Sequence, residues 1–261
     1  MKTSLILSTY NWPEALRCCL ESIARQERLP DEILIADDGS RDETRRLIEA
    51  FAASSGLPLR HIWHEDRGFR LAAIRNRAMA AATGDYLIQI DGDLVLHPRF
   101  VADHIAMARQ GFYVVGSRVV LGPTLSRKLL DHPSQAAFPG LFEHDLKNRL
   151  NGIRLPLLTR LLQNRRGHGA RGCNMAFWRE DVLAVNGYDE QMTGWGHEDK
   201  EFAARLGHLG RQQHSLKFGG LAAHLWHNEA SRSRETVNLD ILHRTEREKT
   251  IRCETGIAQY L

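Results

Sequence analysis

Short apolar runs alternate with helix-spaced apolar patterns over the first 90 residues. Residues 3–9 (TSLILST) predict a buried strand, and the apolar positions Leu16, Leu20 and Ile23 after Pro13 predict a helix. The same alternation continues along the chain. Further strands are predicted at 32–38, 59–64 and 85–90, and further helices at 42–53 and 71–82.

This alternation predicts an α/β fold with a mainly parallel central sheet flanked by helices, because parallel neighbours need a crossover connection and a helix usually supplies it. Ligands of such sheets bind at the carboxyl ends of the strands. Three polar clusters follow the last apolar residue of a strand: Thr9-Tyr10-Asn11, Asp37-Asp38-Gly39-Ser40 and Asp91-Gly92-Asp93. We expect these clusters to line one cleft.

The alternation fades after about residue 120, and residues 145–171 hold seven Lys or Arg side chains against one acid, Asp145. Leucines are interleaved with these bases, which predicts an amphipathic helix pair or a mobile lid. A solvated basic face over ordinary core leucines is one interpretation. Peripheral docking on acidic membrane lipids, or on an anionic acceptor, is the other. Nucleic-acid binding is not expected, because the segment lacks interleaved aromatic side chains.

Composition adds little to this picture. The chain of 261 residues has 43% hydrophobic residues and a formal charge of +3, as expected of one catalytic domain that handles anionic ligands. Its four cysteines have no spacing typical of zinc or redox sites. The first apolar run is too short for a signal peptide, and no stretch is long enough to span a membrane. We therefore expect a reduced, cytoplasmic protein.

Asp91-Gly92-Asp93 places two carboxylates directly after a predicted buried strand. Buried acids are costly unless they are paired or bind a metal, and carboxylate oxygens suit Mg²⁺ or Mn²⁺. Gly92 would leave room for a ligand to approach. A purely structural role as a turn or cap is the alternative, because two acids at this spacing also occur by chance.

Four segments in their order and spacing resemble the nucleotide-sugar domain of glycosyltransferase family 2, which has the GT-A fold: STYN, ADDGSRDET, RGFRLAAIRNRA and ATGDYLIQIDGD. This resemblance covers roughly residues 3–120. A later segment, NGYDEQMTGWGHEDKEFAARL, resembles a motif shared by β-1,4-galactosyltransferases, polypeptide N-acetylgalactosaminyltransferases and bacterial chondroitin-type synthases. Together the two resemblances reach about residue 230.

The family resemblance implies a donor site for a UDP-sugar. Thr9, Tyr10 and Asn11 would belong to this donor site. Tyr10 would lie against the uracil, and Asp38 rather than Asp37 would accept from its N3–H. Tyr10 as a core residue and Asp38 as a turn cap are the alternatives. Arg70 and Arg75 belong to a segment that faces the donor in similar enzymes, where either could pair with an acid or with the diphosphate.

The resemblance also implies a metal site. Asp91 would reach the ribose and Asp93 would bind the metal, with His224 and His227 as candidates for a further ligand. The matching galactosyltransferase segment has its histidine ligand at the position of His227. One imidazole beside carboxylate and diphosphate oxygens favours Mn²⁺, with Mg²⁺ next. The two histidines could equally be packed core residues.

The segment Gly194-Trp195-Gly196-His197-Glu198-Asp199 would form the acceptor side. The resemblance implies that Asp199 is the catalytic base, that Glu198 holds another acceptor hydroxyl, and that Trp195 offers a flat face to a sugar ring. The histidine at position 197 matches the motif of the bacterial synthases and differs from that of the animal enzymes. The acids at 198, 199 and 201 also predict the start of a helix, which is compatible with catalysis.

We expect a nucleotide-sugar portion at 1–120, an acceptor-binding and catalytic portion at 121–234, and a helical tail at 235–261, within one domain. The predicted function is inverting, metal-dependent transfer from a UDP-sugar to a glycan or glycolipid acceptor, in the synthesis of a bacterial surface polysaccharide or lipopolysaccharide-type glycan. The alternatives are a sugar nucleotidyltransferase, or a non-catalytic carbohydrate- or nucleotide-binding protein of the same fold.

Overall fold

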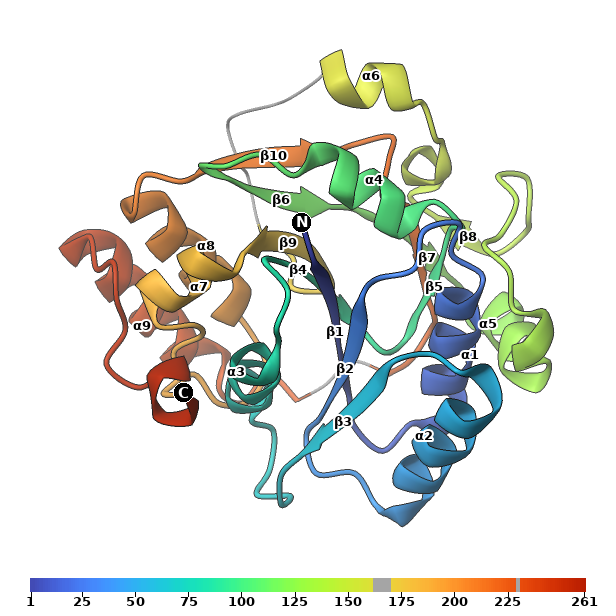
Figure 1. Cartoon of the computed structure of the whole chain (residues 1–261), viewed down its shortest axis with the longest axis horizontal. Coiled ribbons are helices and arrows are strands. Elements are labelled where there is room, and N and C mark those ends of the chain that lie inside the picture. Colours follow the sequence, from blue (N-terminus) through green and yellow to red (C-terminus); the bar gives the residue numbers. More distant parts are fainter. Residues whose placement is uncertain (162–169, 229–230) are drawn as a thin grey trace.

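A computed structural model of the chain describes residues 1–161, 170–228 and 231–261 (Figure 1). A seven-stranded sheet has the order β10-β6-β9-β4-β1-β2-β3, and a second sheet of four short strands has the order β5-β11-β7-β8. In the large sheet only β9 runs antiparallel to its neighbours. The predicted mainly parallel α/β fold is therefore confirmed.

The strands of the two sheets are β1 (Thr3–Thr9), β2 (Glu32–Asp37), β3 (Leu59–Trp63), β4 (Tyr86–Asp91), β5 (Leu94–Leu96), β6 (Phe112–Gly116), β7 (Arg118–Leu121), β8 (Leu146–Lys147), β9 (Asn174–Trp178), β10 (Gln212–Leu216) and β11 (Ala222–His224). The α-helices are α1 (Pro13–Ala24), α2 (Asp42–Ser55), α3 (Leu71–Ala81), α4 (Phe100–Met107), α5 (Pro123–Asp131), α6 (Pro156–Leu161), α7 (Arg179–Val185), α8 (Glu198–His208) and α9 (Glu235–Glu248). The predicted elements of the first 90 residues agree with these bounds to within two residues.

The large sheet is covered on both faces, because successive side chains of a strand point to opposite sides. Along β1, Leu5 and Leu7 belong to the core under α1 and α2, whereas Ile6 belongs to the core under α3 and α8. Strands buried on both faces are continuously apolar, as β1 and β2 are. Strand β9, from the second half of the chain, pairs with β4, so the predicted portions 1–120 and 121–234 share one sheet.

The segment 145–161 forms strand β8, a 3-10 turn at Arg149–Gly152 and helix α6. The expected amphipathic helix pair is thus represented by one short helix in this part of the chain, and residues 162–169, with Arg165 and Arg166, lie outside the described residues. The tail, predicted as helical over 235–261, forms α9 and a 3-10 turn at Ile257–Tyr260, and residues 249–256 between them are not helical.

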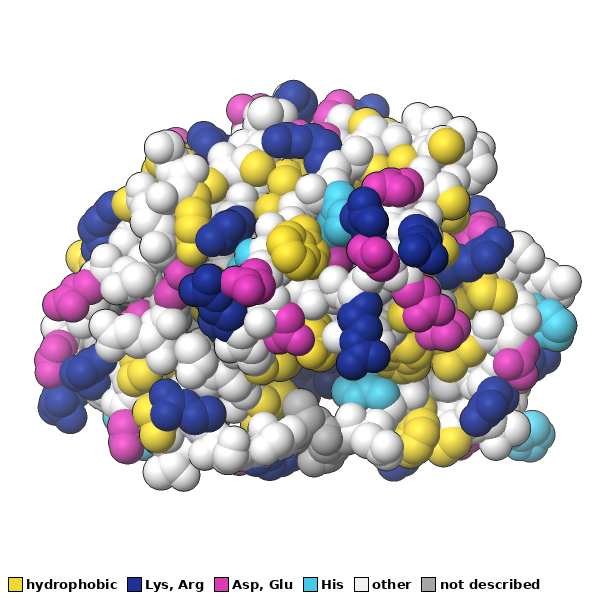
Figure 2. Space-filling model, turned by 90° about the horizontal axis from the view of Figure 1, so that it is seen from below, with side chains coloured by type: hydrophobic (Ala, Val, Ile, Leu, Met, Phe, Trp, Pro, Cys, Tyr) yellow, Lys and Arg dark blue, Asp and Glu magenta, His cyan; other side chains and the backbone are white. Residues whose placement is uncertain are grey.

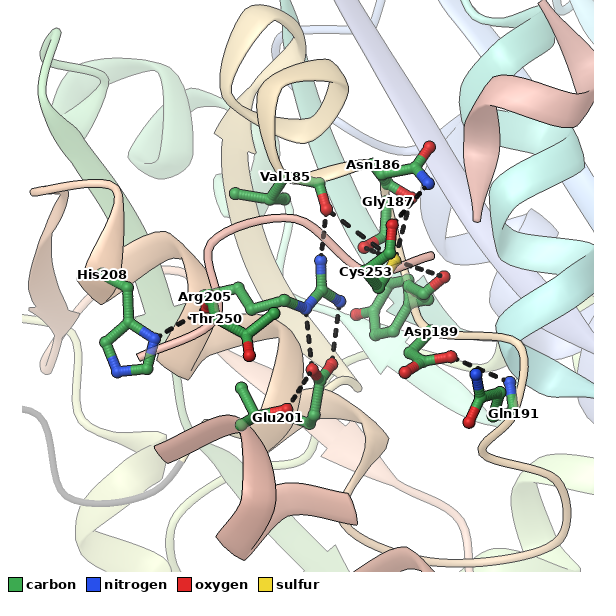
Figure 3. Close-up of polar contacts among 12 residues, drawn as sticks. Val185, Asn186, Gly187, Asp189, Gln191, Glu201, Arg205, His208, Thr250 and Cys253 are labelled. Atoms are coloured by element: carbon green, nitrogen blue, oxygen red, sulfur yellow. Dashed lines mark hydrogen bonds and ion pairs between the residues drawn. The ribbon is translucent and has the colours of Figure 1, made fainter. Parts of the chain in front are cut away.

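A buried polar network fixes α8 against α7 and the tail (Figure 3). Glu201 and Arg205, one helical turn apart on α8, form a double hydrogen bond of 2.7 and 2.8 Å. Arg205 also donates to the carbonyl of Val185, and Thr245 of α9 donates to Glu201. Because a buried ion pair is costly unless its remaining atoms are satisfied, these extra bonds hold the start of α8 in one position.

Each of the four cysteines is buried and free of a disulfide in the described structure. Among the described residues, no helix combines the length and the apolar composition that a membrane crossing requires.

Candidate active site

Strands β1 and β2 run downward in Figure 1, and the predicted polar clusters follow the carboxyl ends of these two strands and of β4, which pairs with β1. Figure 2 views the molecule from that side and shows basic and acidic side chains interspersed with hydrophobic ones across the middle of the face. Parallel pairing of β1 with both β2 and β4 brings Thr9 opposite Asp37 and Ser8 opposite Asp91. The sheet register thus gathers the three clusters as expected.

Asp93, His224 and His227 form a compact cluster. The Oδ2 atom of Asp93 lies 3.2 Å from Nε2 of His224 and 3.3 Å from Nε2 of His227. The ligand atoms of all three residues lie within 4.8 Å of one another. Both histidines therefore belong to the cluster, although the sequence alone favoured His227.

The donor set of this cluster fits a divalent cation. Its one carboxylate and two imidazoles are ligands that Mn²⁺ accepts. The Oδ1 atom of Asp93 is buried without a hydrogen-bond partner in the described structure, which a cation would compensate. Burial raises the pKa of Asp93, but the hydrogen bonds from His224 and His227 outweigh it and leave that pKa below its ordinary value. The same contact raises the pKa of His227.

We expect His224→Ala and His227→Ala each to weaken Mn²⁺ binding by at least about tenfold, because each removes one of three ligands. Titration followed by electron paramagnetic resonance of free Mn²⁺ measures this directly. His132→Ala, which alters an exposed histidine outside the cluster, is the matched control. Unchanged affinity in His224→Ala would show that His224 only packs.

Arg75 joins the donor and acceptor sides of the site. It is 1% exposed, and its guanidinium lies 2.9 Å from Asp91 and 3.3 Å from Glu198. Removal of water raises the pKa of Asp91, and Arg75 offsets only part of this effect. Burial likewise raises the pKa of Glu198. Of the two partners that the sequence left open for Arg75, acid or diphosphate, the structure supplies the acids.

Asp199 lies in the first turn of α8, which begins at Glu198 after His197 in the left-handed conformation. Its Oδ2 accepts a hydrogen bond of 2.7 Å from the backbone N–H of Gly172, and its Oδ1 accepts one of 2.8 Å from the backbone N–H of Lys200. Gly196, at φ 114°, adopts a conformation that side chains disfavour. The backbone N–H groups of Gly172, before β9, and of Lys200, in α8, therefore fix the orientation of this carboxylate.

The residues after β1 and β2 form a second part of the site. Tyr10 is 46% exposed and donates to Asp66 at 2.9 Å, so it is not a core residue. Asp38 accepts from the backbone of Arg70 at 2.9 Å and contacts Nε2 of His64 at 2.6 Å. A carboxylate oxygen has two lone pairs, so Asp38, although only 3% exposed, keeps acceptor capacity beyond these two bonds.

Asp37 and Asn11 are committed to local structure. Asp37 is fully buried, accepts from the Ser40 N–H and contacts His61 at 2.8 Å. The side-chain oxygen of Asn11 accepts from the backbone N–H of Arg41, and the backbone N–H of Asn11 donates to the Ser40 hydroxyl. Contact of Asn11 with a donor remains a prediction. Of the two acids, Asp38 is therefore the one that contacts the loop before α3, through the backbone N–H of Arg70.

A glycine is required at position 92 by a close backbone contact that the sequence did not reveal. A Cβ atom there would lie 2.9 Å from the carbonyl oxygen of Ser8, which the Gly92 N–H contacts at 2.7 Å. The glycine thus allows β1 to approach closely, whereas room for a ligand was the expected reason. Contact of Gly92 with a donor remains a prediction.

Three further residues of the site were missed by the sequence analysis. His64 contacts Asp38, Asp66 holds Tyr10, and Arg118, at the start of β7, lies near Asp91 and Asp93. Burial lowers the pKa of Arg118, but Cys173 and these acids raise it overall. Single charged residues far apart in the sequence give no spacing signal, so only the fold brings them together.

Comparisons with known proteins identify the family and the fold. A family model described as glycosyl transferase family 2 matches residues 4–182, and a second model, described as the N-terminal domain of galactosyltransferase, matches residues 161–227. Chondroitin synthase of Escherichia coli is 26% identical over 85% of this chain and 34% of its own length. Validoxylamine A glucosyltransferase of Streptomyces hygroscopicus subsp. limoneus is 28% identical over 78% of this chain and 47% of its own length. The chain therefore spans less than half of the length of either relative.

Solved structures share the fold at low sequence identity. TarS of S. aureus (residues 1–349) in complex with UDP has a TM-score of 0.68 and 15% identity over 100% of this chain and 68% of its own. GalNAc-T7 with UDP, GalNAc and Mn²⁺ has a TM-score of 0.66 and 15% identity over 93% of this chain and 48% of its own. The fold is the GT-A fold. Since the first family model covers more than half of the sequence, the chain belongs to glycosyltransferase family 2.

Proposed function

We propose that this protein is an inverting, metal-dependent glycosyltransferase that moves a hexose or N-acetylhexosamine from a UDP-sugar to an acceptor hydroxyl. The observation that carries the proposal is the cluster of Asp93, His224 and His227 at the sheet edge where Asp91 and Glu198 share Arg75. The cluster would hold a cation for the donor, and the backbone-held carboxylate of Asp199 would act on the acceptor, which are the two halves of a transfer reaction. The names of the relatives, which include chondroitin and hyaluronan synthases, support the same class.

On the donor side, Tyr10 would stack on the uracil and Asp38 would accept from its N3–H. Thr9 and Gly92 flank these contacts, and Asp91 would reach the ribose. Asp93, His224 and His227 would hold Mn²⁺, or Mg²⁺ in its place. When bound, such a cation stabilises the negative charge of the departing diphosphate.

On the acceptor side, Trp195 would lie against the sugar ring and Glu198 would hold one of its hydroxyls. Asp199 would take the proton of the reacting hydroxyl while that oxygen forms a bond to the anomeric carbon of the donor. The bond from this carbon to the diphosphate breaks on the opposite face, and its electron pair leaves with UDP. Configuration at the anomeric carbon is therefore inverted.

The released product distinguishes this proposal from a sugar nucleotidyltransferase. A panel of UDP-sugars with glycan and glycolipid acceptors is expected to yield UDP, and enzymatic assays for UDP and for pyrophosphate separate the two reactions. Pyrophosphate release would establish the nucleotidyltransferase. Nucleotide binding without turnover across the panel would favour a non-catalytic binding protein.

We further propose that the acceptor is a glycan or glycolipid of a bacterial surface, reached from the cytoplasmic side of the membrane. Phe142, Leu150 and Leu157 are 92%, 71% and 75% exposed within or beside the basic segment 145–171. Apolar side chains next to Lys147 and Arg149 are typical of a surface that touches anionic lipids. We expect the protein to co-sediment with anionic vesicles but not with neutral ones. If the same amount of protein stays in the supernatant with both kinds of vesicle, the proposed contact with the membrane is wrong.

A further inference from the structure

A pocket of about 380 Å³ lies in front of the loop that leads into α8. This volume falls within the range of small-molecule sites. The pocket is built by three loops: the one before α3, the one before α8 and the one before α9. Its lining consists of Arg67, Phe69, Arg70, Thr193, Gly194, Trp195, Ser231, Ser233 and Arg234.

Direct contacts hold these loops together. The N–H of Gly194 donates to the carbonyl of Phe69 at 2.9 Å. Asn238 of α9 donates to the carbonyls of Thr193 and Gly196. The pocket is therefore a built part of the fold, and it shares the loop 193–197 with the start of α8, where Asp199 lies.

The charge of the pocket is one-sided. Among the described residues, its lining has three guanidinium groups and no carboxylate. Arg67 is paired with Glu65 at 2.7 Å, but no carboxylate of the described chain pairs with Arg234. Arg70 donates from Nη2 to the carbonyl of Glu65 at 3.1 Å, but its Nε atom is buried without a hydrogen-bond partner in the described structure. Guanidinium N–H groups that no carboxylate of the described chain satisfies favour a ligand that brings negative charge.

The same pocket has two aromatic walls. Trp195 is 38% exposed and Phe69 is 39% exposed. The guanidinium of Arg232 lies 4.6 Å from the Trp195 ring and is also close to Glu235. Because this guanidinium lies over the ring, it stacks on one face of Trp195. An exposed aromatic face suits the apolar face of a sugar ring.

The diphosphate of the donor is a less suitable occupant. It must reach the cation held by Asp93, His224 and His227, and none of these residues lines the pocket. Asp91 and Arg75 are also absent from the lining. We propose that the pocket binds an acceptor glycan that carries an anionic group, a carboxylate or a phosphate, on the sugar next to the reacting hydroxyl. This inference rests on the proposed transfer function and names its acceptor class.

The test compares matched sugars on the full chain loaded with UDP and Mn²⁺. Ligand-observed NMR titrations use methyl β-glucuronide, the 6-phosphate of methyl β-glucoside, and methyl β-glucoside itself. We expect at least one anionic glycoside to bind about tenfold more tightly than the neutral one. The two anionic ligands distinguish a carboxylate from a phosphate. Sodium chloride should reduce the preference, because salt screens the guanidinium charge.

Variants identify the residues responsible. Arg234→Gln is expected to reduce the anionic preference to below about threefold, whereas Arg45→Gln on the exposed face of α2 leaves it intact. Trp195→Ala should weaken charged and neutral glycosides alike. Melting curves of each variant confirm that it is folded.

Four outcomes would overturn the inference. Equal affinity for charged and neutral glycosides would make the pocket a neutral subsite, and no binding of any glycoside would remove it as an acceptor site. If the anionic preference survives in Arg234→Gln, the group that recognises the anion lies outside this pocket. Weaker UDP binding in Arg234→Gln would assign the arginines to the donor. Failure of the wild-type protein to bind UDP with Mn²⁺ would instead contradict the proposed function. Calorimetric titration with UDP measures this binding separately from the glycoside titrations.

Discussion

Replacing Asp199 by asparagine is expected to lower the rate of sugar transfer by about 10³-fold, because the reacting hydroxyl loses the group that takes its proton. The amide keeps the size of the carboxylate but is not a base. Binding of UDP with Mn²⁺ should stay within about twofold of the wild type, because Asp199 lies on α8 and outside the cation cluster. Initial rates with saturating donor, together with calorimetric titration of UDP, measure the two effects.

Asp240→Asn provides the matched control for this experiment, since it removes an exposed carboxylate of the neighbouring helix α9. It should leave both the rate and the binding unchanged. A rate for Asp199→Asn within tenfold of the wild type would assign the base to another residue. Equal loss of transfer and of UDP binding would indicate a structural role.

Replacing Arg75 by methionine is expected to lower the free energy of unfolding by about 3 kcal/mol, because it leaves Asp91 and Glu198 without their shared cation. Asp91 keeps 30% exposure of its side chain, which places the effect at the low end for a broken buried pair. For a chain of this size, that change lowers the melting temperature by roughly 6–12 °C. Differential scanning calorimetry measures it, with Arg45→Met on the surface of α2 as the control.

The loss should also depend on pH. The pKa values of Asp91 and Glu198 are raised in the folded protein, so the folded state binds their protons more tightly than the unfolded chain does. The stability that these groups contribute is therefore present at low pH and declines as pH rises above the unfolded value of about 4. Without Arg75 the two pKa values rise further, so the deficit of the variant should be smaller at pH 5 than at pH 8. A deficit that is equal at both pH values would contradict the proposed pairing.

Much of the fold could be predicted because β1 and β2 are apolar throughout and α1 and α2 have helix-spaced apolar faces. The positions of Tyr10, Asp38 and Asp93 at strand ends followed from the same reasoning. Parallel strands place their carboxyl ends on one edge, so strand boundaries alone indicated the location of the site. The second half of the chain gave weaker signals, because β9 is antiparallel and β8 and β11 are only two and three residues long.

Side-chain partners could not be predicted in the same way. Arg75 faces Glu198 across 123 positions, and His64 faces Asp38 across 26. Such contacts depend on how helices and loops pack, and the spacing of residues along the sequence does not predict this packing. His224 illustrates this limit: it and His227 were candidates for one further ligand, with His227 favoured, and the arrangement of β11 beside β5 brings both to Asp93.

Calorimetric titration of the full chain with UDP and with GDP, each with and without Mn²⁺, tests the central claim most directly. The account predicts binding of UDP that requires Mn²⁺ and is lost in Asp93→Ala, with GDP binding more weakly. Asp240→Asn should bind as the wild type does. Absence of binding by either nucleotide in the presence of Mn²⁺, or UDP binding that survives in Asp93→Ala, would contradict the metal-dependent transferase.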